Sequence, residues 1–204
     1  MQSQAESIYQ HSLFLAETGE TVAYRNGTYV AFHAEGKTDP LASDIRYFRI
    51  MTAWGANKKI PFRMINSHDK AGAVKDSSKA ETLARSLRLR LASSRNMVLI
   101  IGQTTWMDAD WVPFEIRLAV DIFKIPIIAA YPGRGAIYDA YLTAPLWPPA
   151  LRQRILNKTA HVIHVPFKRE PIADAIDQFD HDNFPKGGGL GCYSPETYAS
   201  WNIQ

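Results

Sequence analysis

The sequence is poor in cysteine and has no long apolar run. Its single cysteine, Cys192, cannot form an internal disulfide, which is typical of a protein in a reducing compartment. No apolar stretch approaches the roughly 20 residues that a membrane-spanning helix needs. The first residues, MQSQAESIYQHSLFLAETGE, have no basic region before their short apolar patch, unlike a secretory signal. We therefore expect a cytoplasmic protein with no membrane partner.

The sequence also has little excess of charge of either sign. Lysine and arginine number 23 and the acidic residues 20, so that the formal net charge is +3 and the isoelectric point is about 8.9. This excess of positive charge is too small to predict a nucleic-acid partner.

Several common ligand-binding motifs are missing. There is no GxGxxG and no Walker A sequence, so the usual dinucleotide and triphosphate cradles are not predicted. The glycines of GGGLG at 187–191 follow no predicted strand and open no helix, which indicates a flexible tail. None of the six histidines has metal-site spacing, and His161 and His164 point to opposite faces of one strand. We therefore expect no metal, and Cys192 has no neighbouring base that would make it a nucleophile.

What remains is an alternation of short apolar strands and amphipathic helices. Apolar runs predict strands at 29–33, 61–65, 97–101, 125–131 and 161–165. Periodic segments between and after them predict helices at about 41–54, 78–91, 110–123 and 171–179, listed here in chain order. This order predicts an α/β protein with a flavodoxin-like, doubly wound, five-stranded parallel sheet.

The same pattern suggests three segments. Residues 1–26 form an N-terminal extension, 27–184 form the α/β domain, and 185–204 form a Gly-rich and aromatic tail. Within the domain, residues 132–160 are irregular, and the double proline at 148–149 precludes a continuous helix there.

Trp111 and Glu115 stand out on the helix between the third and fourth strands. Their i,i+4 spacing places both side chains on one helix face. That helix leaves the carboxyl edge of the sheet, where ligands bind in open α/β folds. An indole beside a carboxylate excludes water on one side and provides a surface for a flat ligand. The alternative is a solvated helix glutamate, which is the common case.

The segment RNMVLIIGQTTWMDADWVPFEIRLAVDIFKIPIIAAY resembles the third strand, third helix and fourth strand of TIR domains that cleave NAD. The Trp-x-x-x-Glu motif and the following K-I-P-I-I both match. Upstream, TYVAFHAEGKTD resembles the first TIR strand, and FRMINSHD resembles the second strand and its loop. The YFRIMTAW helix is similar to TIR-like proteins of the Thoeris anti-phage system. The resemblance covers about residues 28–131.

The resemblance implies an NAD nucleosidase or ADP-ribosyl cyclase of antiviral defence, with Glu115 as the catalytic glutamate. NAD is then the substrate, and neither a cofactor nor a metal is needed. Cleavage of the ribose–nicotinamide bond passes through an oxocarbenium-like transition state that a carboxylate stabilises. A cyclic ADP-ribose-type product is then a diffusible signal for a separate effector, and assembly into a homo-oligomer is compatible with such a pocket. The alternatives are a non-catalytic interaction module, which would use the arginines at 85, 88 and 90, and a nucleotide-sensing module.

Six further residues are candidates for substrate binding, each with a plainer alternative. Phe32 ends the first strand and either stacks on a base or belongs to the core, and His33 either contacts phosphate or ribose or caps a loop. Ser67 and Asp69 either line the ribose or diphosphate site or form a turn. Arg49 resembles a helix arginine of the Thoeris relatives but also fits a solvated face. Trp111 either takes part in binding or packs the glutamate into place.

Overall fold

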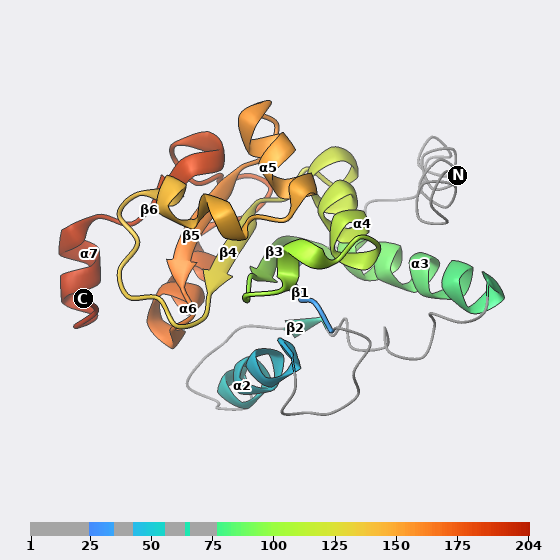
Figure 1. Cartoon of the computed structure of the whole chain (residues 1–204), viewed down its shortest axis with the longest axis horizontal. Helices are drawn as coiled ribbons and strands as arrows, with labels where there is room; N and C mark the ends of the chain where they lie inside the picture. The colour runs from blue at the N-terminus through green and yellow to red at the C-terminus, as the bar shows by residue number, and fades with distance from the viewer. Residues whose placement is uncertain (1–24, 35–42, 56–63, 66–76) are drawn as a thin grey trace.

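A computed structural model describes residues 25–34, 43–55, 64–65 and 77–204 of the chain. It contains one sheet in which all neighbouring strands are parallel, in the order β2-β1-β3-β4-β5-β6 (Figure 1). The strands are β1 (Gly27–Ala31), β2 (Met64–Ile65), β3 (Ser94–Ile100), β4 (Ile127–Tyr131), β5 (Val162–Pro166) and β6 (Gly191–Cys192). The predicted fold class is confirmed, and the two-residue β6 adds a sixth strand to the five expected.

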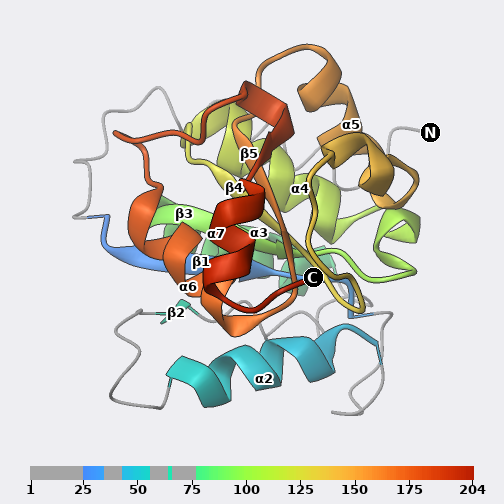
Figure 2. The same cartoon turned by 90° about the vertical axis from the view of Figure 1, so that its left-hand side faces the viewer.

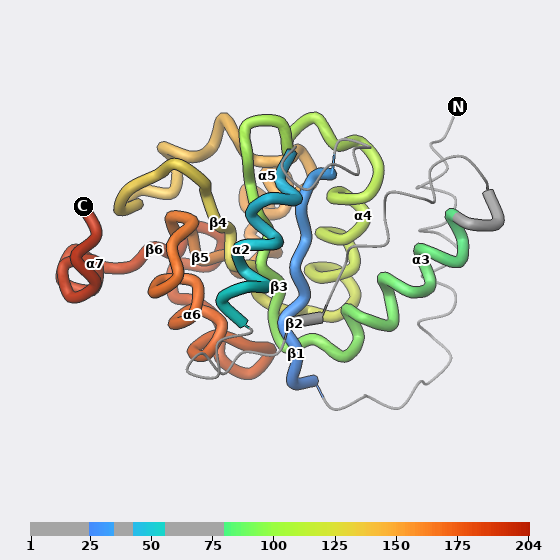
Figure 3. Tube along the Cα trace, turned by 90° about the horizontal axis from the view of Figure 1, so that it is seen from below, coloured from blue at the N-terminus to red at the C-terminus, as the bar shows by residue number. Residues whose placement is uncertain are grey.

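Helices cover both faces of this sheet, as a doubly wound topology requires (Figures 1 and 2). On one face lie α2 (Ile45–Gly55) and α6 (Arg169–Gln178), and Figure 3 shows α2 running alongside β1 and β3. On the other face lie α3 (Ser77–Ala92), α4 (Trp111–Arg117) and α5 (Pro149–Leu156). The short α7 (Pro195–Ser200) and the C-terminus lie at the β6 end of the molecule. No helix among the described residues has the length and apolarity needed to cross a bilayer.

The alternation of side chains along β1 shows how the sequence builds the two cores. Tyr29 and Ala31 point into the cluster under α3 and α4, whereas Val30 and Phe32 point into the cluster under α2 and α6. All of these side chains are buried, so β1 is apolar on both faces in the way a central parallel strand is. The strand therefore positions Tyr29 toward α4, and Phe32 and His33, the two residues after it, lie at the carboxyl edge.

The helix predicted over about 110–123 is a composite. Its α-helical part, α4, ends at Arg117 and is followed by a π-helical segment, η3 (Leu118–Ile122). The wider turn shows in the bond from the Phe123 N–H to the Leu118 carbonyl, 2.9 Å, which spans five residues. Short π segments are rare and frequently accompany functional sites. Two 3₁₀ segments complete this region, η2 (Thr105–Met107) and η4 (Ala140–Leu146).

The Gly-rich segment is ordered, which corrects the prediction of a flexible tail. A 3₁₀ turn, η5 (Gly188–Leu190), leads into β6, which pairs with β5. Gly191 fits because a Cβ atom there would lie 2.7 Å from the Val162 carbonyl oxygen, closer than a side chain permits. The glycines thus allow a close approach of backbones, a signal that a composition argument misses. The N-terminal extension falls almost entirely outside the described residues, and the proposed segment boundaries stay a prediction.

A buried polar network ties this C-terminal segment to the sheet. His164 on β5 is fully buried; its Nε2 lies 3.0 Å from the Gly189 carbonyl and its Nδ1 2.7 Å from the Tyr131 hydroxyl. A carbonyl only accepts, so Nε2 carries the proton and the Tyr131 hydroxyl donates to Nδ1. The Trp147 indole N–H donates to the Tyr131 and Thr143 hydroxyl oxygens, both at 2.9 Å. All the ring nitrogens of the network are therefore satisfied.

Burial of His164 predicts a loss of stability in mild acid. Desolvation lowers the pKa of this imidazole from 6.5 to about 4, although the bond to Gly189 opposes the shift. The unfolded chain then takes up a proton as the pH falls below 6.5, while the folded chain does so only near pH 4. The free energy of unfolding should fall by about 3 kcal/mol across this window and gain nothing from this residue above it. Denaturant titrations through the window measure the effect, and a variant without His164 should lack this part of the pH dependence.

Candidate active site

The side chain of Glu115, on α4, points toward the sheet and has no exposed surface. Its Oε1 accepts a short hydrogen bond from the hydroxyl of Tyr29, which is itself fully buried on β1. The alternative of a solvated helix glutamate is therefore wrong. A buried carboxylate is costly unless it is hydrogen-bonded or paired, so solubility of the helix does not explain a glutamate at this position.

Trp111 is the first residue of α4, one turn before Glu115. Its half-buried indole packs against the core, and its ring meets Phe114 edge-on, with the centroids 6.0 Å apart. This contact supports the reading of Trp111 as a packing residue at the start of the helix. Its role toward a ligand stays a prediction.

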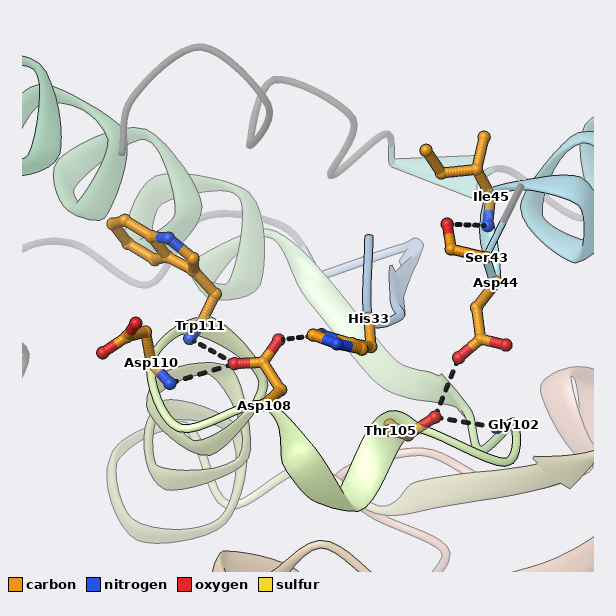
Figure 4. A network of polar contacts seen from close by, with 9 residues as sticks. All are labelled: His33, Ser43, Asp44, Ile45, Gly102, Thr105, Asp108, Asp110 and Trp111. Atoms are coloured by element: carbon orange, nitrogen blue, oxygen red, sulfur yellow. Dashed lines mark hydrogen bonds and ion pairs between the residues drawn. The ribbon is translucent and has the colours of Figure 1, made fainter. Parts of the chain in front are cut away.

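The two candidates at the end of β1 have different surroundings. Phe32 is 2% exposed and stacks on Phe48 of α2, with the ring centroids 5.2 Å apart, which favours the core alternative. His33 lies further out, with 18% of its side chain exposed, and its Nδ1 is 2.8 Å from Asp108 Oδ2. Figure 4 shows this contact between His33 and the loop that joins β3 to α4.

Asp108 joins His33 to the start of α4. Its Oδ1 accepts from the backbone N–H groups of Asp110 and Trp111, at 3.0 and 2.9 Å (Figure 4). Asp108 and Tyr29 were not among the site residues predicted from the sequence. For Asp108 the signal was the turn DADW just before the helix, because an aspartate often accepts from the amides two and three residues on.

A second carboxylate fixes the start of the same loop. Thr105, fully buried, donates to Asp44 Oδ2 at 2.8 Å and accepts from the Gly102 N–H at 2.7 Å (Figure 4). Asp44 directly precedes α2, and its backbone carbonyl accepts from the first turn of that helix. Two carboxylates thus hold the loop at 101–110 in place. Asp44 ties it to the start of α2, and Asp108 ties it to the chain after β1.

Gly102 is required by this arrangement. A Cβ atom at Gly102 would lie 2.1 Å from Asp44 Oδ1, so alanine must displace the carboxylate from Thr105. We expect Gly102→Ala to lower the free energy of unfolding by about 2 kcal/mol, measured by denaturant titration. In an Asp44→Ala background the same change should cost clearly less, because the clash is gone. Equal cost in both backgrounds would contradict this account.

The remaining candidates do not join this constellation. Arg49 is exposed on α2, as a residue of a solvated face is. Ser67 and Asp69 lie outside the described residues. Burial, reinforced by Asp139, raises the pKa of the half-buried Cys192 thiol to about 11, which leaves it protonated and a poor nucleophile at neutral pH.

Among the described residues, a group of side chains with metal-ligand spacing occurs at Asp180, His181 and Asp182. It follows the end of α6, where the carbonyls of Ile176 and Phe179 accept from Asn96 near the start of β3. That is the amino edge of the sheet, opposite to the edge of His33 and Asp108, so this group does not belong to the candidate site.

The model of the family described as Thoeris protein ThsB, TIR-like domain, matches residues 29–136. This span runs from β1 to just past β4 and includes Tyr29, His33, Asp108 and Glu115. No curated protein matches the chain.

Proposed function

This chain belongs to the family of the TIR-like domain of the Thoeris protein ThsB, a module of antiviral defence, and from that premise we propose that it cleaves NAD. The reaction breaks the bond between nicotinamide and ribose, and Glu115 is the catalytic residue. A cyclic ADP-ribose-type product, released as a signal, then activates a separate effector.

The observation that carries the proposal is the environment of Glu115. The carboxylate is removed from water and is oriented by the Tyr29 hydroxyl. A carboxylate in a water-excluded site stabilises positive charge far better than one in solvent, because the effective dielectric constant is lower. That is the property an oxocarbenium-like transition state requires.

The electrons of the breaking bond explain why one carboxylate is sufficient. They move onto the positively charged ring nitrogen of nicotinamide, which leaves as a neutral molecule and needs no proton. Positive charge develops at the ribose carbon, where Glu115 stabilises it. Water then adds and loses a proton, giving ADP-ribose, or an adenine nitrogen adds and loses a proton, giving a cyclic isomer.

The covered position of Glu115 adds a requirement. The side chain has no exposed surface. Substrate therefore reaches it only after a local movement of the residues that cover it, such as the first turn of α4. The same burial would also fit a non-catalytic interaction module or a nucleotide-sensing module. In an interaction module, the exposed Arg85 on α3 would belong to the contact face.

Product analysis separates these functions. Purified protein is incubated with NAD, alone and with lysate of phage-infected cells as a trigger, and the products are identified by mass spectrometry. The proposal predicts nicotinamide together with ADP-ribose or a cyclic product lighter by one water. Binding of NAD without nicotinamide release, in both conditions, would support the sensing module instead.

A further inference from the structure

Asp108 has no part in the reaction as proposed above, yet both of its carboxylate oxygens are engaged. Oδ2 lies 2.8 Å from His33 Nδ1, and Oδ1 accepts from the backbone of Asp110 and Trp111. Only 9% of the side chain is exposed. One carboxylate therefore links the end of β1 to the first turn of α4, one turn before Glu115 (Figure 4).

The contact determines which nitrogen of His33 carries the proton. A carboxylate that accepts two backbone N–H groups is favoured in its ionised form, and an ionised carboxylate only accepts. His33 Nδ1 must then be the donor, and in the neutral ring Nε2 keeps its lone pair. The neutral ring thus presents an acceptor, not a donor, to whatever lies beyond it.

We propose that Asp108 is a positioning residue that holds His33 in the Nδ1–H tautomer, so that Nε2 accepts a hydrogen bond from a ribose hydroxyl of the bound nucleotide. The inference rests on the proposed NAD-cleaving function. A ribose hydroxyl can donate to Nε2, whereas a phosphate oxygen only accepts and would need the proton on Nε2. His33 is partly exposed and lies two residues after the end of β1, at the edge where ligands bind in this fold class.

Asp108→Asn tests the tautomer with little change in shape. The asparagine oxygen can still accept from Asp110 and Trp111, but its NH₂ group then faces His33 and donates. Nδ1 must become the acceptor, and the proton moves to Nε2. The ¹⁵N chemical shifts of histidine-labelled protein at alkaline pH report this exchange. Asp110→Asn is the matched control, because Asp110 is an exposed residue of the same loop and loses the same charge.

Kinetics give the second readout. We expect Asp108→Asn to raise KM for NAD about tenfold with kcat changed less than about twofold, since Nε2 then carries a proton and the ribose hydroxyl can no longer donate to it. Asp110→Asn should leave both within about twofold of the wild type. Combined with His33→Ala, Asp108→Asn should add nothing, because it acts through His33. Additive effects, or an unchanged tautomer in Asp108→Asn, would overturn the proposal.

Binding is tested apart from cleavage. In Glu115→Gln protein, which keeps the substrate intact, added NAD should shift the His33 Nε2 resonance. The absence of a shift at saturating NAD would overturn the ribose contact. If NAD shifts this resonance but the wild-type protein releases no nicotinamide, the proposed function is overturned and the role of Asp108 stands.

Discussion

Replacing Glu115 by glutamine is expected to reduce nicotinamide release from NAD by at least about 100-fold. Glutamine has nearly the same shape, and its amide oxygen can still accept from the Tyr29 hydroxyl. Only the negative charge that stabilises the ribosyl cation is lost. Because the shape and the hydrogen bond are kept, the fold should persist, and the melting temperature should stay within about 3 °C of the wild type. Release assays and thermal unfolding measure the two effects.

Glu81→Gln is the matched control for this variant. Glu81 is exposed on α3, and the same substitution there removes a charge from the surface. It should leave nicotinamide release unchanged. A large loss in Glu81→Gln, or a collapse of the fold in Glu115→Gln, would show that the assay reports general damage and not the chemistry of one carboxylate.

The largest effect on stability is expected at His164. In His164→Phe, the Tyr131 hydroxyl loses its acceptor and the Gly189 carbonyl loses its donor, both in a fully buried place. Leaving two buried groups unsatisfied should cost about 4 kcal/mol of unfolding free energy. For a chain of this size that corresponds to a fall of about 10 °C in melting temperature. The C-terminal segment, held by Gly189, should also become more accessible to proteases.

His161→Phe provides the comparison on the same stretch of chain. Its ring stacks on Phe184, with the centroids 4.2 Å apart, and its buried Nδ1 has no hydrogen-bond partner. A phenyl ring keeps the stacking and removes that unsatisfied nitrogen, so stability should change by less than about 1 kcal/mol. Equal destabilisation by the two substitutions would contradict the importance assigned to the His164 network.

Periodicity was sufficient to predict the layers of the fold. The apolar runs predicted the parallel strands because a strand that is buried on both faces needs apolar residues at nearly every position. The two-residue β6 could not be found, since Gly191 and Cys192 carry no alternation and pair only because glycine allows the backbones to approach. Likewise, nothing in Leu118–Ile122 distinguishes a π turn from an α turn.

The candidate site was predicted only in part. Glu115 was predicted from its motif. Its burial could also be predicted from the helix pattern, since Val112, Glu115, Ile116 and Ala119 follow the i, i+3, i+4, i+7 spacing of a buried helix face. The partner hydroxyl was not predictable, because Tyr29 lies 86 residues away in sequence and meets Glu115 only across the packed layers. Asp108 and His33 are similarly distant.

Nicotinamide release from NAD, followed by mass spectrometry on wild-type protein and Glu115→Gln side by side, tests the central claim most directly. Both proteins are assayed alone and with the lysate of phage-infected cells. The account predicts nicotinamide from the wild type and at least about 100-fold less from the variant. Equal release by the two proteins, or intact NAD with both proteins under both conditions, would contradict it.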